Sequence, residues 1–232
     1  MQELMLYHGS RQIVEHPRFG LGKPYNDYGR GFYCTESLEL AKEWACPTKT
    51  DGYANQYVLS MDGLNVMRLT KGKFHILNWL AILLANRSFD ISSAIGKNAR
   101  DYILSHFLPG TENVDVMIGY RADDSYFSFA EDFLNNTISL RDLNLAMRLG
   151  TLGEQVVLLS ERAFEQIRFL GYEIADFNIY YYKRSVRDKN ARTAYAERKK
   201  NLQQLMEDVF ILDIMRKAMK NDDPLLQSIL SE

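Results

Sequence analysis

The sequence predicts an α+β fold with a helical insertion near its middle and a helical tail at its C-terminal end. Three stretches carry this prediction. Residues 155–159, QVVLL, have the continuous apolar character of a buried strand. Residues 74–86 are apolar nearly all round, which indicates a buried helix. From about Ser185 glycine disappears, and the charged stretch 191–220 predicts a final helix.

Short apolar or alternating runs predict the strands. Leu4–Tyr7 ends at His8-Gly9-Ser10 and therefore predicts a strand followed by a loop. By the same criteria we expect further strands at residues 32–35, 53–59, 64–69, 114–120, 155–159 and 172–182.

Helical periodicity between capping and stop residues predicts the helices. Ser139 with Asp142 resembles a capping box, and Gly171 is the expected stop of the helix that follows Ser160. The expected helices are 37–46, 74–86, 99–107, 126–135, 139–150, 161–170 and 191–220. We place the helical insertion at about 71–110, the main domain at 1–182 and the tail at 183–232.

Residues 11–31 contain Pro17, Pro24 and several glycines without a clear period. Irregular segments of this length in compact domains usually carry function. We therefore expect this segment to contribute to a site.

Composition and charge limit the class of protein. The chain is 46% hydrophobic with a formal net charge of −2, so it has material for a core and no overall attraction to nucleic acid or membrane. The N-terminus lacks a signal-peptide pattern, and the apolar stretch 76–85 is too short to span a bilayer. Cys34 and Cys46 fit no CxxC motif. We expect a cytoplasmic protein with free thiols and no membrane contact.

Metal and phosphate-loop chemistry are not expected. His16, His75 and His106 lie far apart and are interpreted as surface or core histidines, so we predict no metal. Residues 20–23, GLGK, are followed by Pro24 where a phosphate-binding loop has Ser or Thr.

The segment 183–200 holds eight Lys or Arg and allows two interpretations. It either binds phosphates of a nucleic acid, or it is a solvated helix face whose charges pair with Glu207, Asp208 and Asp213.

Four motifs occur in a meaningful order: LYHGS at 6–10, NDYGRGFYCTES at 26–37, LAKEWA at 40–45 and LGEQVVLLS at 152–160. Together they resemble the ADP-ribosyltransferase superfamily, on the His-Tyr-Glu branch of the poly(ADP-ribose) polymerases. Within it, the chain is most similar to a bacterial family catalogued as a domain of unknown function. The resemblance implies split antiparallel β-sheets and NAD as co-substrate.

The chemistry of NAD⁺ suits these residues, because it joins a cationic nicotinamide to ribose. Gly9 can bring its backbone against the carboxamide because it has no side chain. The resemblance implies that Tyr33 stacks on nicotinamide, that Trp44 is a second stacking aromatic and that His8 bonds the adenosine ribose. It also places Ser10 and Gly31 in the NAD site.

The third catalytic position has two candidates, Glu154 and Gln155, which point to opposite faces of their strand. Alignment with the polymerases favours Glu154, and alignment with the bacterial relatives favours Gln155. A glutamine can bond ribose but cannot supply charge, which favours single transfer, glycohydrolysis or binding alone. Asp123 and Asp124 are candidates for recruiting the acceptor, with turn formation as the alternative.

The leading hypothesis is an NAD-dependent mono-ADP-ribosyltransferase that modifies a protein or nucleic acid. By analogy it would be a toxin of a toxin–antitoxin or phage-defence system, with a small antitoxin-like partner docking on the tail. Two alternatives stay open: an NAD- or ADP-ribose-binding module without turnover, and a nucleic-acid-binding protein that uses residues 183–200.

Overall fold

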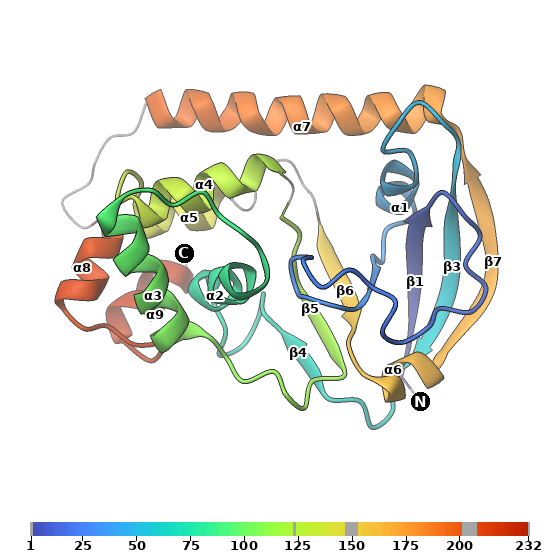
Figure 1. Ribbon diagram of the computed structural model, residues 1–232, viewed down its shortest axis with the longest axis horizontal. Helices are drawn as coiled ribbons and strands as arrows, with labels where there is room; N and C mark the ends of the chain where they lie inside the picture. The colour runs from blue at the N-terminus through green and yellow to red at the C-terminus, as the bar shows by residue number, and fades with distance from the viewer. Residues whose placement is uncertain (1, 123, 147–152, 201–207, 232) are drawn as a thin grey trace.

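The computed structural model describes residues 2–122, 124–146, 153–200 and 208–231. Two β-sheets occupy one end of the molecule and most helices gather at the other (Figure 1). The three-stranded sheet has the order β1 (Glu3–Ser10), β3 (Gly52–Ser60), β7 (Ile167–Ala175), and both pairings are antiparallel. The first strand runs through His8-Gly9-Ser10 because Ser10 still pairs with Tyr53, so the predicted loop at these residues is wrong.

The four-stranded sheet has the order β2 (Phe32–Cys34), β6 (Glu154–Leu158), β5 (Val116–Tyr120), β4 (Val66–Arg68). The pairs β2–β6 and β5–β6 are antiparallel, whereas β4–β5 is parallel. A parallel pair needs a long crossover connection, and here the predicted helical insertion provides it. The expectation of antiparallel sheets is therefore wrong for this one pair.

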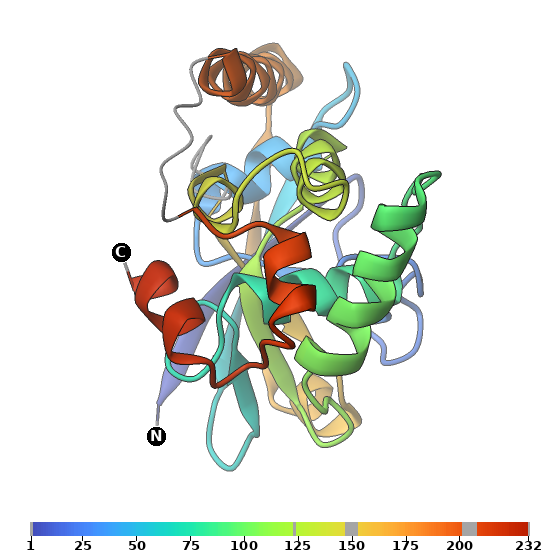
Figure 2. The same cartoon turned by 90° about the vertical axis from the view of Figure 1, so that its left-hand side faces the viewer.

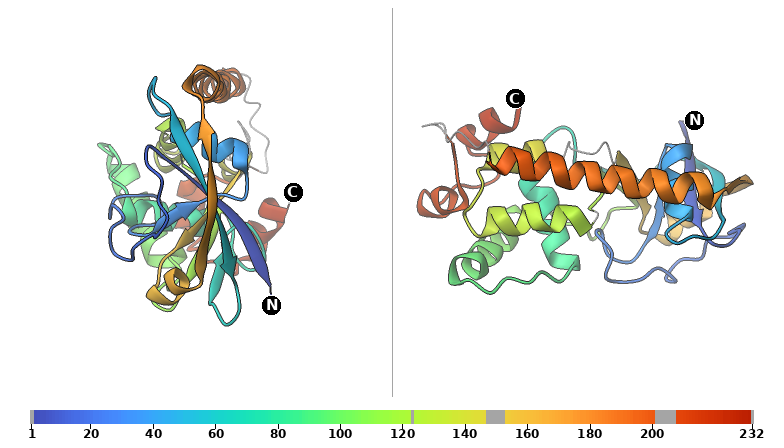
Figure 3. Two further views of the ribbon diagram at one scale, coloured as in Figure 1. Left: turned by 90° about the vertical axis from the view of Figure 1, so that its right-hand side faces the viewer. Right: turned by 90° about the horizontal axis from the view of Figure 1, so that it is seen from above.

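The two sheets pack against each other through apolar side chains. Leu6 and Leu59 of the three-stranded sheet share a buried cluster with Val116, Val156 and Leu158 of the four-stranded sheet. Seen from the sheet end, the strands of the two sheets overlap closely, whereas the view from above shows the helices extending away from them (Figure 3). The α+β class and the division into two sheets are thus confirmed.

Most helices lie on the side of the four-stranded sheet that faces away from the three-stranded sheet (Figure 2). The first helix of the chain is capped by Ser37, whose side chain accepts a hydrogen bond from the Leu40 N–H. The helices are α1 (Leu38–Ala45), α2 (Ile76–Asn86), α3 (Ala94–Phe107), α4 (Asp124–Leu134), α5 (Leu140–Ala146), α6 (Glu161–Glu165), α7 (Phe177–Lys200), α8 (Ile211–Arg216) and α9 (Pro224–Ser231).

The larger core lies among these helices. As predicted, α2 is buried on all sides, with Trp79, Leu80 and Leu83 almost fully covered. The same core contains Ile214 of α8 and Leu226 of α9. The C-terminal helices therefore complete the core of the domain, and they are not a separate appendage.

The region after β6 differs most from the prediction. The helix expected to run to Leu170 ends at Glu165, and β7 follows from Ile167 because it pairs with β3. Gly171 does not stop a helix; it lies at an irregularity in this pairing. The aromatic stretch 172–182 is divided between β7 and α7, so the predicted boundary at 182–183 falls inside one continuous helix.

Among the described residues, no helix is both long and apolar enough to cross a membrane. The one long helix, α7, is polar along most of its length.

Candidate functional site

A cavity of about 580 Å³ opens where the two sheets separate. Tyr7 of β1 and Thr35 exchange backbone hydrogen bonds of 2.8 and 2.9 Å, which joins the sheets at this point. Beyond this bridge β1 and β2 diverge, and residues of both strands line the cavity. Much of one wall comes from the irregular segment 11–31, which has neither helix nor strand, as predicted.

His8 of β1 faces the cavity and spans the gap between the diverging strands. Its Nδ1 lies 2.7 Å from the Tyr33 carbonyl oxygen, which can only accept, so Nδ1 carries the proton. Burial lowers the pKa of His8, although the bond to Tyr33 acts in the opposite direction. The neutral ring therefore has Nε2 as a hydrogen-bond acceptor.

Gly9 also lines the cavity, and its backbone faces the open edge of β1. The Tyr7 N–H and C=O point toward Thr35, so those of Gly9, two residues further, point to the same edge. A side chain at Gly9 would collide with α1, since a Cβ would lie 2.0 Å from the Ala41 carbonyl oxygen. The glycine thus allows α1 to pack on β1. Its backbone N–H and C=O meet no partner among the described residues and are directed to the cavity.

Tyr33 of β2 contributes its ring to the cavity, while its hydroxyl is engaged elsewhere. The hydroxyl donates to the Gly29 carbonyl at 2.7 Å and accepts from the Tyr28 N–H at 3.0 Å. Burial raises the pKa of Tyr33 well above its usual value, so the hydroxyl stays neutral. Gly29 has a φ of +75°, which a glycine adopts without strain. The loop before β2 therefore holds the aromatic ring in place.

Trp44 of α1, the second aromatic residue predicted for the site, also lines the cavity, as do Phe32 and Phe164. Its indole N–H is buried and has no hydrogen-bond partner in the described structure. The Arg121 guanidinium lies 4.7 Å from the centre of the indole ring. Arg18 and Arg87 also line the cavity, so three arginine residues contribute to its walls.

The structure separates the two candidates on β6. Gln155 lines the cavity, and its side chain is on the same face of the sheet as Val157. Glu154 points to the opposite face, where Arg68 Nη1 lies 2.5 Å from its carboxylate and the Thr70 hydroxyl donates to it. The cavity therefore contains the amide and not the carboxylate of this pair.

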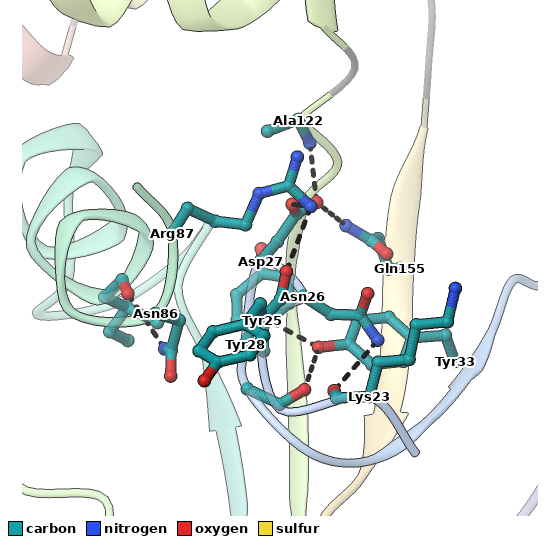
Figure 4. Close-up of polar contacts among 12 residues, drawn as sticks. Lys23, Tyr25, Asn26, Asp27, Tyr28, Tyr33, Asn86, Arg87, Ala122 and Gln155 are labelled. Carbon is teal, nitrogen blue, oxygen red and sulfur yellow. Dashed lines mark hydrogen bonds and ion pairs between the residues drawn. The ribbon is translucent and has the colours of Figure 1, made fainter. Parts of the chain in front are cut away.

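The carboxylate that the cavity does contain is Asp27, which was not among the residues predicted for the site. Figure 4 shows it between Ala122, Gln155 and Arg87. The Ala122 N–H donates to Asp27 Oδ2 at 3.0 Å, and Gln155 Nε2 donates to the same atom at 2.8 Å. Its position in the motif NDYGRGFY was a usable indication. No sequence signal indicated Arg87, at the end of α2, because nothing in the sequence connects that helix to the motifs.

The remaining predicted residues take other places. Gly31 lines the cavity, whereas Ser10 does not and instead donates a hydrogen bond to the Gln12 carbonyl. Asp123 and the side chain of Asp124 lie outside the described residues. His16, interpreted from sequence as a surface or core histidine, is exposed at the cavity.

Part of the basic segment pairs with α1. Lys183 lies 2.8 Å from Glu39, and Arg187 lies 2.8 Å from Glu43. These two basic residues therefore contact acidic residues far upstream, whereas the interpretation as a solvated helix face predicts partners downstream. Arg192 and Lys200 are exposed.

No group of His, Cys, Asp or Glu in the described part of the chain has the arrangement of a metal site. Cys34 and Cys46 are free and fully buried. Burial raises the pKa of the Cys34 thiol well above its usual value, which makes it a poor nucleophile.

Comparison with known proteins gives a family but no characterised relative. The model of the DUF3990 family, described as a protein of unknown function, matches residues 4–169. Neither curated proteins nor solved structures give a match. The matched stretch contains every residue that lines the cavity. The chain therefore belongs to the DUF3990 family.

Proposed function

We propose that this protein is an NAD-dependent mono-ADP-ribosyltransferase whose site is the cavity between the diverging sheets. One observation carries the proposal. Residues from all four sequence motifs, each of a type that suits NAD chemistry, line the same cavity of about 580 Å³. They are His8, Gly9, Gly31, Tyr33, Trp44 and Gln155. The volume is within the range of about 300–1,000 Å³ that is typical of small-molecule sites.

The groups in the cavity match the parts of NAD⁺. The free backbone edge at Gly9 offers one donor and one acceptor, as a carboxamide requires. The rings of Tyr33 and Trp44 offer faces for a cationic heterocycle. His8 Nε2 accepts from a ribose hydroxyl, and guanidinium groups suit a diphosphate. This distribution supports a dinucleotide ligand with a positively charged ring.

In the proposed reaction the bond between the nicotinamide nitrogen and ribose C1′ breaks. Its electron pair leaves with nicotinamide, which becomes neutral, and C1′ develops positive charge. A nucleophilic atom of the acceptor then bonds to C1′ and releases its proton to solvent. We propose a protein or nucleic acid as acceptor. Because Gln155 carries no charge, we expect transfer of a single ADP-ribose and no polymer.

The test is release of nicotinamide from NAD⁺, together with transfer of label from adenylate-labelled NAD⁺ to a cell extract. We expect both with the wild-type protein. Tyr33→Ala should abolish them, because it removes the ring wall, whereas Glu154→Gln should retain them, because Glu154 contacts Arg68 and Thr70 on the other face. Activity that is lost in Glu154→Gln and kept in Tyr33→Ala would contradict the proposed site.

One observation favours a second candidate, a module that binds NAD or ADP-ribose without turnover. Gln155 is the residue of β6 that faces the cavity, and its side chain is an amide. An amide does not stabilise developing positive charge as a carboxylate does. Calorimetric titration with NAD⁺ and ADP-ribose distinguishes the two. Binding that Tyr33→Ala abolishes, without any nicotinamide release, would favour the module.

A further inference from the structure

Asp27 is buried inside the cavity, with 6% of the residue's surface exposed. It is held from three directions, by the Ala122 backbone N–H, by the Gln155 amide and by Arg87, whose guanidinium lies 3.8 Å from Oδ1 (Figure 4). Burial raises the pKa of Asp27, while these hydrogen bonds and the positive charges of Arg87 and Arg121 act against that rise. A buried carboxylate is costly unless it is paired, so its presence here needs a reason.

Asp27 determines how the amide of Gln155 is oriented. Gln155 Nε2 lies 2.8 Å from the carboxylate and 3.5 Å from the Tyr120 carbonyl oxygen. A carboxylate and a carbonyl only accept hydrogen bonds, so the amide nitrogen must face them. Oε1 is then directed away from Asp27, and no described residue donates a hydrogen bond to it. The amide thus has one oxygen left to accept from a ligand.

We propose that Asp27 and Gln155 together replace the single catalytic carboxylate expected at this position of the site. Gln155 Oε1 accepts a hydrogen bond from a hydroxyl of the ribose next to nicotinamide. Asp27 acts through Gln155 as a positioning residue, and its negative charge favours the positive charge that develops on that ribose. This inference rests on the proposed function for the identity of the ligand, while the orientation of Gln155 by Asp27 is independent of turnover.

The alternative role for Asp27 is purely structural, as a tie between the loop before β2 and the segment after β5. A structural tie predicts that Asp27→Asn lowers stability and that its effect on the ligand follows the loss of folded protein. The proposed pair predicts an effect on the ligand in molecules that are fully folded, and it predicts rescue when the carboxylate and the amide exchange places.

The experiment compares Asp27→Asn, Gln155→Glu and the exchange variant Asp27→Asn/Gln155→Glu. For each we measure urea unfolding, the Kd for NAD⁺ by calorimetry and the kcat of nicotinamide release. Asp115→Asn is the matched control, because Asp115 is also a buried carboxylate but lies outside the cavity, against Asn65, Ser160 and Arg162. Its Kd and kcat should equal those of the wild type.

In Asp27→Asn the amide of Gln155 is no longer fixed, so Kd should rise roughly fivefold, as for loss of one neutral hydrogen bond. The kcat should fall by a further factor of about ten or more, because the charge is lost. Gln155→Glu places two carboxylates in contact and should also lower kcat. The exchange variant restores one carboxylate bonded to one amide, and its kcat should exceed that of either single variant.

Unchanged Kd and kcat in folded Asp27→Asn would overturn the inference, as would an exchange variant no better than the single ones. If the wild type binds NAD⁺ but releases no nicotinamide, the proposed reaction fails, and Kd alone decides on the pair. In that case a weaker Kd in folded Asp27→Asn supports the orientation of Gln155, and an unchanged Kd contradicts it.

Discussion

At the scale of single residues, the side chains at the cavity are fixed by neighbours that have no direct part in the proposed chemistry. Asn55 of β3 is buried; its Nδ2 donates to the His8 carbonyl at 3.1 Å, and its Oδ1 accepts from the Val14 N–H at 2.9 Å. The start of the irregular segment is thereby attached to β3. Contacts of this kind, behind the residues that line the cavity, hold the irregular segment in place as a wall of the cavity.

His75 gives a pH dependence at this scale. It caps α2: its Nδ1 accepts from the Leu77 N–H, and Asn78 Oδ1 accepts from the His75 N–H at 2.8 Å. Burial lowers the pKa of His75 to about 4. A protonated Nδ1 cannot accept, so the cap needs the neutral ring.

The unfolded chain takes up a proton on His75 near its ordinary pKa, whereas the folded chain does so only near pH 4. The contribution of neutral His75 to stability is therefore complete above about pH 6.5 and is lost as the pH falls toward 4. We expect the free energy of unfolding to fall by about 2 kcal/mol more in the wild type than in His75→Asn between about pH 7 and pH 5. Urea unfolding at both pH values measures this. Equal losses in the two proteins would show that His75 titrates normally.

At the scale of elements, α7 connects the two ends of the molecule. It starts beside the sheets and runs over the helices (Figures 1 and 3). At its first half Arg187 pairs with Glu43 of α1, and both side chains are largely buried. At its second half the Tyr195 hydroxyl donates to Asp132 of α4 at 2.6 Å. This helix therefore fixes α1, which carries Trp44, relative to the helical core.

The Arg187–Glu43 pair gives a test of that role. Arg187→Met leaves a buried carboxylate without its partner and should lower the free energy of unfolding by about 3 kcal/mol. The double variant Arg187→Met/Glu43→Leu should recover much of the loss, because no charge stays buried. Lys183→Met is the control on the same helix, since the Lys183–Glu39 pair is exposed and solvent-screened pairs contribute little. Equal effects of Arg187→Met and Lys183→Met would mean that α7 is not held by the buried pair.

At the scale of the whole molecule, the C-terminal helices are part of the folding unit. Tyr102 of α3 donates to the Met219 carbonyl at 2.9 Å, and Asn78 of α2 donates to Asn221 at 2.6 Å. Leu226 of α9 is fully buried in the core that α2 and α3 build. The insertion and the tail, far apart in sequence, thus stabilise each other.

A point substitution tests whether the C-terminal helices unfold together with the rest of the domain, without shortening the chain. Leu226→Ala should lower the free energy of unfolding by about 3 kcal/mol and lower it for the whole domain at once, because a core cavity is formed. Intrinsic tryptophan fluorescence, to which Trp44 and Trp79 both contribute, and far-ultraviolet circular dichroism should give coincident unfolding curves. The control is Leu225→Ala next to it, whose side chain is 40% exposed and should cost much less. Separate transitions by the two probes would indicate an independent tail.

Local patterns in the sequence were sufficient for several parts of the fold. The buried helix at 76–86, the apolar strand at 154–158 and the irregular wall at 11–31 each depend on composition and capping within their own segment. His8, Gly9, Tyr33 and Trp44 were selected through the likeness of their motifs to those of a known family, and all four line the cavity. Short motifs make such a selection possible because they preserve spacing along the chain.

Pairing and proximity required the tertiary structure. The β7 strand is formed because β3 offers it partners, whereas its local sequence had suggested the end of a helix. The parallel pairing of β4 and β5 depends on where the crossover helices pack. The face of β6 that meets the cavity depends on register, because adjacent side chains alternate and a shift of one residue would exchange Glu154 for Gln155.

The sequence by itself therefore determined the residue types that the segments bring to the cavity, and these are the types on which the proposal of an NAD site rests. The tertiary structure alone decided which of them share one cavity. It turned Glu154 toward Arg68, placed Asp27 against Gln155 and brought Arg87 and Arg121 to the same wall. The physical reason is that spacing along a strand or a motif is a local property, whereas a contact between distant segments is fixed by sheet register and helix packing, which no single segment encodes.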